Sequence, residues 1–250
     1  RTGAEIVPID SEHVALHQAL RAGSRAEVRR LVLTASGGPF LHRDPATFAD
    51  IRREEALRHP TWSMGAKISI DSSTLINKGL ELIEASHLFG MRPDAIDVVV
   101  HPRSLVHSLV EFCDGSWLAQ LSVNDMIFPI QYALAYPERW PNEFPRLALA
   151  ELGTLEFLPL DNRRFPAVEL ARAALAAGES APAVLNAANE VAVHAFLDGA
   201  IGYPDIVATI SEVLAGHQPE ALADLDAALD WDRWGRQRAS EALSKRARAR

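Results

Sequence analysis

The sequence has one cysteine, Cys113, in 250 residues, so no disulfide can form within the chain and a reducing compartment fits best. No apolar run approaches the roughly 18–20 residues of a transmembrane helix, and the start lacks the pattern of a secretory signal. Positive charge is in the minority, and the net charge of −8 argues against a general nucleic-acid binder. We therefore expect a cytoplasmic protein that binds neither membranes nor nucleic acids.

Two nucleotide-binding fingerprints are also absent. The sequence contains neither G-x-G-x-x-G nor G-x-x-x-x-G-K-[ST], so it carries no signature of a dinucleotide-binding turn or a P-loop. The chain starts at Arg1 without a methionine and looks like part of something longer. Its 48% hydrophobic and 23% charged residues are typical of a globular protein.

Strand-like and helical patterns alternate in the first part of the chain, and only helical patterns follow in the last part. This order predicts an α/β fold, with a mixed sheet layered with helices, followed by a C-terminal all-helical bundle. We expect an α/β domain over 1–139, an extended proline-rich connector over 140–166 and the bundle over 167–250. The predicted strands are 6–9, 31–34, 68–70, 97–100 and a hairpin of 105–112 with 117–121, and the predicted helices are 14–20, 47–58, 72–86, 167–177, 183–197, 203–215 and 222–249.

Two carboxylates, Asp10 and Glu12, follow the first predicted strand. Residues two apart in an extended segment point the same way, so both carboxylates can aim at one point. Oxygen ligands of this kind suit a hard cation such as Mg²⁺ or Mn²⁺. Taken alone, the same residues are more commonly a surface turn or a helix cap.

The predicted helix 72–86 carries Asn77, Lys78 and Glu81 on one face, because spacings of three and four bring side chains together. This face can supply a third carboxylate for a metal, together with groups for an anionic or hydroxylated ligand. The alternative is a solvated stripe with an ordinary Lys–Glu pair.

Serine and glycine residues suggest a phosphate pocket. Ser36-Gly37-Gly38 follows the second strand, and glycines let backbone N–H groups approach an anion closely. Ser72-Ser73 opens the predicted helix that carries Asn77, and a helix N-terminus attracts anions. A simple turn and a simple serine cap remain the alternatives.

A loop over 59–65 carries the large apolar side chains of Trp62 and Met64. Exposing such side chains to water is unfavourable, so we expect them to pack over another part of the protein or over a ligand. It is either a lid that excludes water from a substrate or a loop whose tryptophan fills the core. His101 and His107 lie between a strand and the hairpin, where they can face one cleft or serve structure alone.

Six strings carry a resemblance to a known family. In chain order they are PIDSEH (8–13), LTASGGPF (33–40), HPTWSMG (59–65), DSSTLINKGLELIEA (71–85), HPRSLVHSLV (101–110) and NAANEVAV (186–193). Together they closely resemble the 1-deoxy-D-xylulose 5-phosphate reductoisomerases of non-mevalonate isoprenoid biosynthesis, over nearly the whole chain. The resemblance implies an oxidoreductase and isomerase, usually homodimeric, that uses NADPH and Mg²⁺ or Mn²⁺. Its phosphorylated sugar substrate, 1-deoxy-D-xylulose 5-phosphate, is converted to 2-C-methyl-D-erythritol 4-phosphate.

The resemblance also implies roles for individual residues. The metal ligands of the family fall here on Asp10, Glu12 and Glu81. Substrate-binding positions, including those for the phosphate, fall on Ser11, Ser36, Ser72, Asn77, Lys78 and Glu81. Catalytic positions fall on His59, Trp62, Met64, Lys78 and His107, and Met126 matches a cofactor-binding position close to the nicotinamide.

The sequence departs from the family at two points. No NADPH-binding domain precedes Asp10 in this sequence, and Arg103 stands where the family usually has glutamine. Two other functions remain open from the sequence: a metal-dependent sugar-phosphate isomerase that uses no nucleotide, and a non-catalytic interaction domain that retains the fold.

Overall fold

The computed structural model describes residues 3–62 and 64–248. Contacts divide the chain into two compact units that interleave along the sequence. The first unit comprises Arg1–Ser36 and Glu84–Leu160, and the second comprises Gly37–Ile83 and Asp161–Arg250. These limits differ from the expected borders after 139 and 166, because helix α3 (Ala66–Thr74) packs on helix α8 (Ser180–Leu197) of the C-terminal bundle.

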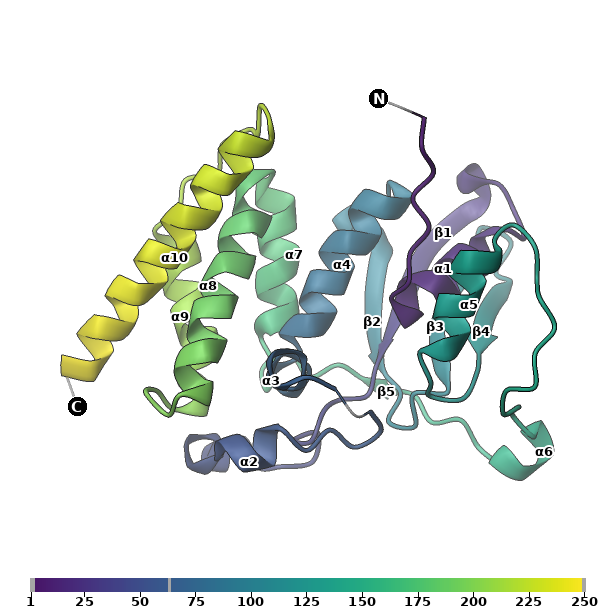
Figure 1. Cartoon of the computed structure of the whole chain (residues 1–250), viewed down its shortest axis with the longest axis horizontal. Helices are drawn as coiled ribbons and strands as arrows, with labels where there is room; N and C mark the ends of the chain where they lie inside the picture. The colour runs from purple at the N-terminus through teal and green to yellow at the C-terminus, as the bar shows by residue number, and fades with distance from the viewer. Residues whose placement is uncertain (1–2, 63, 249–250) are drawn as a thin grey trace. The chain divides into compact units, whose positions relative to one another are not determined.

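The first unit contains a five-stranded sheet in the order β4-β3-β1-β2-β5 (Figure 1). β1 and β2 are parallel, with Leu31 opposite Ile96, and the other neighbours are antiparallel. β1 is central, and its consecutive residues Leu31, Val32 and Leu33, whose side chains alternate between the two faces, are all buried, as expected for a strand covered on both faces. The strands are β1 (Val28–Ala35), β2 (Ile96–Val100), β3 (Val106–Phe112), β4 (Trp117–Leu121) and β5 (Leu158–Pro159).

Helix α1 (Ser11–Leu20) packs on β1, β3 and β4, and helix α5 (Ile127–Ala135) packs on α1. The apolar side of α1 places Leu16 in the core of this unit, where it is fully buried. The N-terminus of α1 carries Asp10 and Glu12. The sheet and its helices thus confirm the mixed α/β architecture.

The second unit is built from helices around α8, which contacts α3, α7, α9 and α10. Two glycines allow close packing here. A Cβ at Gly235 of α10 would lie 3.0 Å from the Cβ of Ala187, and one at Gly79 would lie 2.7 Å from that of Ala171. The helices of this unit are α2 (Arg53–Ala56), α3, the first part of α4 (Ile76–Phe89), α7 (Ala167–Ala177), α8, α9 (Tyr203–Ala215) and α10 (Leu225–Arg248).

Most predicted elements are confirmed. The helices predicted over 167–177 and 203–215 coincide with α7 and α9, and the hairpin is β3 and β4. The connector over 140–166 is largely irregular and contains only the short α6 (Leu149–Leu152) and β5 among regular elements.

Two predicted strands are wrong. Residues 6–9 form no strand, and Ile6 is 75% exposed; Pro8 has no N–H to donate to a ladder. Residues 68–70 lie inside α3, where Ile70 is buried and Ile68 faces out. A short alternating run cannot by itself distinguish a strand from one helical turn.

Two predicted helices differ clearly from the observed ones, and one helix was missed. The helix predicted over 72–86 is α4, which begins only at Ile76, because Leu75 adopts a left-handed φ of 61° and ends α3. The helix predicted over 47–58 is split into a 3-10 segment and α2 by the extended residue Ile51. Helix α5 was missed, since its run of apolar residues contains Pro129 and shows no clear period.

Among the described residues, no helix combines the length and the hydropathy that crossing a membrane requires.

Candidate functional site

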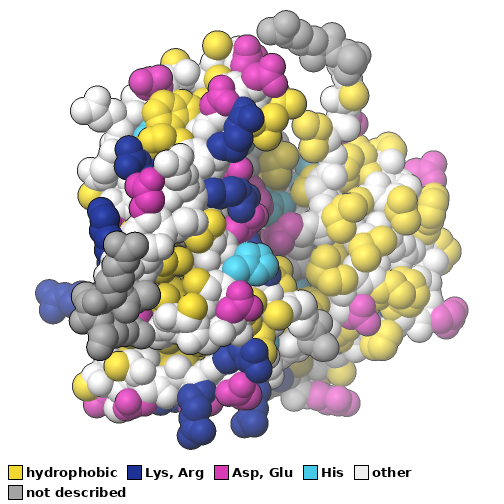
Figure 2. Space-filling model, turned by 60° about the vertical axis from the view of Figure 1, so that its left-hand side comes forward, with side chains coloured by type: hydrophobic (Ala, Val, Ile, Leu, Met, Phe, Trp, Pro, Cys, Tyr) yellow, Lys and Arg dark blue, Asp and Glu magenta, His cyan; other side chains and the backbone are white. Residues whose placement is uncertain are grey.

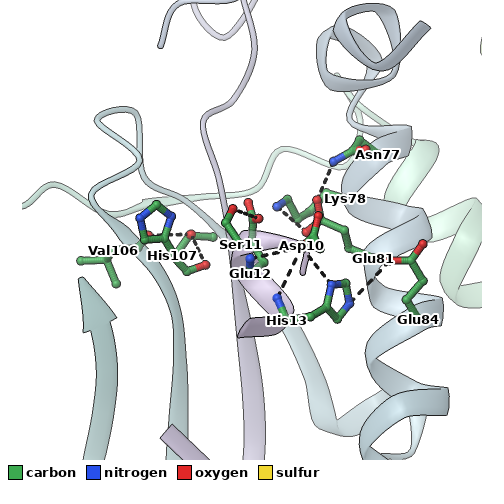
Figure 3. A network of polar contacts seen from close by, with 11 residues as sticks. Asp10, Ser11, Glu12, His13, Asn77, Lys78, Glu81, Glu84, Val106 and His107 are labelled. Carbon is green, nitrogen blue, oxygen red and sulfur yellow. Dashed lines mark hydrogen bonds and ion pairs between the residues drawn. The ribbon is translucent and has the colours of Figure 1, made fainter. Parts of the chain in front are cut away.

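Asp10, Ser11 and Glu12 lie at the start of α1 (Figure 3). Asp10 is the N-cap: its Oδ1 accepts hydrogen bonds from the backbone N–H of Glu12 (3.1 Å) and of His13 (3.4 Å). The Ser11 hydroxyl donates to Oε2 of Glu12 over 2.6 Å. The prediction of an extended segment here is wrong: Asp10 caps the helix and Glu12 occupies its first turn, where the helix dipole favours negative charge. The two carboxylates nevertheless offer oxygen atoms within 4.8 Å of each other, as the predicted convergence requires.

A buried imidazole, His13, lies between two carboxylates of the first unit. Its Nδ1 is 2.9 Å from Oδ1 of Asp10, and its Nε2 is 3.7 Å from Oε2 of Glu84 in the last part of α4 (Figure 3). The ring of Phe89 stacks on it at a centroid distance of 6.4 Å. Sequence reasoning missed both His13 and Glu84, although the spacing of three from Asp10 to His13 was a usable signal.

In the second unit, Asn77, Lys78 and Glu81 lie together on the first part of α4. Asn77 Nδ2 donates to Oε1 of Glu81 and Lys78 Nζ donates to Oε2, each over 2.5 Å (Figure 3). The Lys78 and Glu81 side chains are only 5% and 4% exposed. The spacing predicts this shared face correctly, but the face is buried, so the alternative of a solvated stripe is wrong.

Ser72 lies in the last turn of α3, so the prediction that it opens the helix of Asn77 is wrong. It nevertheless lies beside the glycine loop. A Cβ at Gly38 would be 2.8 Å from the Ser72 carbonyl oxygen, and Gly38 has a φ of +66°, so only glycine fits there. Ser36 precedes Gly38 by two residues and is the last residue of the first segment of the first unit.

His59 organises the loop that was predicted as a lid. Its Nδ1 accepts hydrogen bonds from the backbone N–H of Thr61 (3.2 Å) and of Trp62 (3.0 Å). Burial, and secondarily the charge of Lys78, lowers the pKa of His59 to about 4. The ring is therefore neutral near pH 7, with its proton on Nε2. Trp62 and Met64 are half-buried, and Ser63 lies outside the described residues.

The two histidines near the hairpin have different partners. His107 is buried on β3, and its Nε2 is 2.9 Å from the hydroxyl of Ser122. His101 is buried at the end of β2, where its Nδ1 is 2.7 Å from the carbonyl of Glu156 and its ring stacks on Phe157. His101 thus fastens the connector, which explains it structurally.

Arg103, which replaces the glutamine of the family pattern, also holds the connector. Its Nη1 donates to the carbonyl oxygens of Leu152 (2.6 Å) and Thr154 (3.3 Å). Ser104 follows with a left-handed φ of 53°. The arginine therefore ties the turn after β2 to α6 within the first unit.

The sixth string of the sequence, NAANEVAV, has a structural counterpart in α8. Asn189 Nδ2 donates to Oδ1 of the buried Asp71 over 2.9 Å, and Lys67 Nζ lies 2.7 Å from the other carboxylate oxygen. Burial raises the pKa of Asp71, although Lys67 and Asn189 oppose that effect. These contacts fix α3, and with it Ser72, against α8.

Met126 occupies the N-cap position of α5 and is 37% exposed. It lies in the first unit, as do Asp10, Ser11, Glu12, Ser36 and His107. The remaining candidates belong to the second unit: His59, Trp62, Met64, Ser72, Asn77, Lys78 and Glu81.

Comparisons with known proteins agree on one family. A family model described as "DXP reductoisomerase C-terminal domain" matches residues 121–238, and one described as "1-deoxy-D-xylulose 5-phosphate reductoisomerase C-terminal domain" matches residues 6–89. Relatives named 1-deoxy-D-xylulose 5-phosphate reductoisomerase include one from Chlorobium phaeobacteroides, 50% identical over 240 residues, and one from Desulforamulus reducens, 52% identical over 239 residues. Each alignment covers 96% of this chain and 62% of the relative.

Solved structures agree with the sequence matches. The reductoisomerase of Zymomonas mobilis in complex with NADPH has a TM-score of 0.90 at 42% identity, covering 96% of this chain and 62% of that one. A DOX-P reductoisomerase in complex with NADPH, fosmidomycin and magnesium has a TM-score of 0.90 at 43% identity, covering 97% of this chain and 64% of the other. This chain therefore spans somewhat less than two thirds of the length of these proteins. On these matches it belongs to the 1-deoxy-D-xylulose 5-phosphate reductoisomerase family.

Proposed function

We propose that this chain supplies the metal-binding and substrate-binding part of a reductoisomerase that converts 1-deoxy-D-xylulose 5-phosphate to 2-C-methyl-D-erythritol 4-phosphate with NADPH. The names of the relatives support this reaction, and solved relatives were captured with NADPH, magnesium and fosmidomycin. The same comparisons do not favour an isomerase without a nucleotide or a non-catalytic interaction domain.

The observation that carries the proposal is the placement of acidic residues along α4. Glu81 precedes Glu84 by three positions in one continuous helix, so their side chains belong to neighbouring turns of one face. Glu84 is 3.7 Å from His13, whose other ring nitrogen holds Asp10. This placement supports the proposed metal ligands, which are Asp10 and Glu12 in the first unit and Glu81 in the second.

The donor set fits a hard divalent cation, because it offers carboxylate oxygens alone. We propose Mg²⁺ or Mn²⁺ as that cation. When bound, such an ion acts as a Lewis acid toward the oxygens of a ketone and its neighbouring hydroxyl.

We assign the phosphate of the substrate to Ser36, Ser72, Asn77 and Lys78. The close approach of Gly38 to Ser72 and the start of α4 at Ile76 support this assignment, since a helix N-terminus and backbone N–H groups favour an anion. Binding energy from the phosphate, remote from the reacting carbons, can then orient the substrate.

The remaining candidates have roles at the reacting part of the substrate. Ser11 contacts substrate hydroxyls, and Trp62 and Met64 cover the substrate and exclude water. His59 donates from Nε2–H, since its Nδ1 accepts from two backbone N–H groups. His107 lines the pocket, and Met126 lies near the nicotinamide of NADPH, which supplies the hydride.

We further propose a cytoplasmic homodimer. β4 is the last strand at one edge of the sheet in the part of the chain that the structure describes. Trp117 and Leu118 of this strand are 44% and 39% exposed. Figure 2 shows further patches of hydrophobic side chains, on the right-hand side of its view. An exposed edge with large apolar side chains supports pairing with a second chain.

The proposal is tested by calorimetric titration of the chain with 1-deoxy-D-xylulose 5-phosphate, with and without Mn²⁺, while NADPH oxidation is followed in the same preparation. We expect substrate binding that depends on Mn²⁺ and is lost in Glu81→Gln. Glu212→Gln, an exposed carboxylate on α9 that pairs with Arg246, serves as the matched control. Equal binding with and without metal, or normal binding by Glu81→Gln, would contradict the proposed site. Oxidation of NADPH would support the complete reaction.

A further inference from the structure

We infer that Glu84 is a positioning residue, which acts through His13 on Asp10 and thereby strengthens metal binding. The inference rests on the proposed function, because it takes Asp10 as a metal ligand. Asp10, His13 and Glu84 all belong to the first unit, and their contacts are therefore defined within one compact part of the chain.

The first step concerns the carboxylate of Asp10. Its Oδ1 accepts from the backbone N–H of Glu12 and of His13, and it is also 2.9 Å from Nδ1 of His13. Three contacts on one oxygen fix the orientation of the carboxylate. We therefore expect Oδ2 to be the oxygen that faces the cation, and any change that releases Oδ1 to weaken the site.

The second step concerns the ring of His13. It is 1% exposed, so its polar nitrogens need partners within the protein. Nδ1 faces Asp10, and Nε2 faces the Glu84 carboxylate at 3.7 Å. Contacts at both nitrogens oppose rotation of the ring about its Cβ–Cγ bond, so Glu84 holds Nδ1 toward Asp10 without touching Asp10 itself.

The third step concerns what surrounds this arrangement. A surface cavity of about 420 Å³ lies against it, and Ile6, Pro8, Ile9 and Leu88 supply its apolar lining. Its remaining lining residues are Asp10, His13, Glu84 and His87. Asp10, His13 and Glu84 therefore line one surface cavity, and His13 is the buried member of the three.

In many metalloproteins, residues that do not touch the metal orient the side chains that bind it. Mutation of such a residue typically lowers metal affinity by about 10- to 100-fold. Glu84 is one step further out, and its side chain is 57% exposed. We therefore expect Glu84→Gln to weaken metal binding by about tenfold, at the low end of that range.

The test is a titration of the chain with Mn²⁺, with free Mn²⁺ measured by its electron paramagnetic resonance signal, so that no catalysis is needed. The variants are Glu84→Gln, His13→Gln and the two combined. Asp94→Asn is the control, because it removes an exposed carboxylate of the same unit that pairs with Arg92. Thermal unfolding of each variant confirms that it is folded.

The inference predicts weaker Mn²⁺ binding in Glu84→Gln, unchanged binding in Asp94→Asn, and no further loss when Glu84→Gln is added to His13→Gln. Unchanged binding in Glu84→Gln would overturn it. Independent, additive losses would also overturn it, since Glu84 would then act by its charge and not through His13. If the unaltered chain bound no Mn²⁺, the proposed metal site itself would fail.

Discussion

The two units hold their acidic candidate ligands in opposite ways. In the first unit, the Asp10 side chain is 42% exposed and is held by backbone N–H groups at the start of α1. In the second, Glu81 is 4% exposed and is held by the side chains of Asn77 and Lys78. A helix cap is local and survives solvent exposure, whereas a buried carboxylate depends on its paired cation. Similar mutations in the two units should therefore have very different effects on stability.

The histidines of the two units also have different surroundings. His13 of the first unit lies between two carboxylates, whereas His59 of the second is half-buried and lies within reach of the positive charge of Lys78. The surroundings of His59 favour a neutral ring, because burial and the charge of Lys78 both lower its pKa.

The largest expected effect is that of Lys78→Ala. It leaves the Glu81 carboxylate buried without its cation, and we expect a loss of about 3–5 kcal/mol in the free energy of unfolding. Urea denaturation measures this loss. Arg233→Ala is the control, since it breaks an exposed pair with Asp230 and should change stability by at most about 1 kcal/mol. If Lys78→Ala and Arg233→Ala changed the free energy of unfolding equally, the buried ion pair would matter no more than the exposed one, which would contradict the account.

A smaller effect is expected at Asp10. Asp10→Ala removes the cap of α1 and should cost about 1 kcal/mol, whereas Asp10→Asn should cost much less, because asparagine also caps helices. Both changes should weaken Mn²⁺ binding. Thermal unfolding measures the stability of each variant, and Mn²⁺ titration measures its metal affinity. If metal affinity fell only as far as stability fell, Asp10 would not be a direct ligand.

The smallest effect is on the titration of His59. The pKa of His59 is about 4 in the folded chain, below the ordinary value of 6.5, so the folded chain favours the neutral ring. This preference contributes fully to the stability of the fold above about pH 6.5. That contribution is lost as the pH falls from 6.5 toward 4. Lys78→Gln should raise the pKa of His59, but keep it below 6.5 because burial is the larger cause. Nuclear magnetic resonance of the ring measures both values, and a pKa near 6.5 in the unaltered chain would contradict this environment.

The sequence predicted those parts of the fold that long, periodic patterns define. α7 and α9 and the Asp114-Gly115 hairpin have strong local signals. The failures occurred where tertiary contacts decide. Leu75 breaks a continuous helical pattern with a left-handed φ, and nothing in its residue type indicates that conformation. Likewise, α3 is a helix because it packs on α8 through Asp71 and Asn189, which are far apart in sequence.

Much of the candidate site was accessible because its chemistry depends on spacing. The pattern Asn77-Lys78-Glu81 requires only helical geometry, and the structure places these side chains in contact. His13 and Glu84 were missed, since their contact joins α1 to the later part of α4 across more than 60 residues of the chain. The role that the resemblance assigns to each residue stays a prediction.

The most direct test of the account is the stoichiometry of Mn²⁺ binding in the unaltered chain, in Asp10→Asn and in Glu81→Gln, measured by electron paramagnetic resonance. The account predicts one ion per chain, with binding lost or strongly weakened by either change, because the proposed function assigns both Asp10 and Glu81 to one ion. Two ions per chain, each lost in only one of the variants, would contradict it. So would unchanged affinity in either variant.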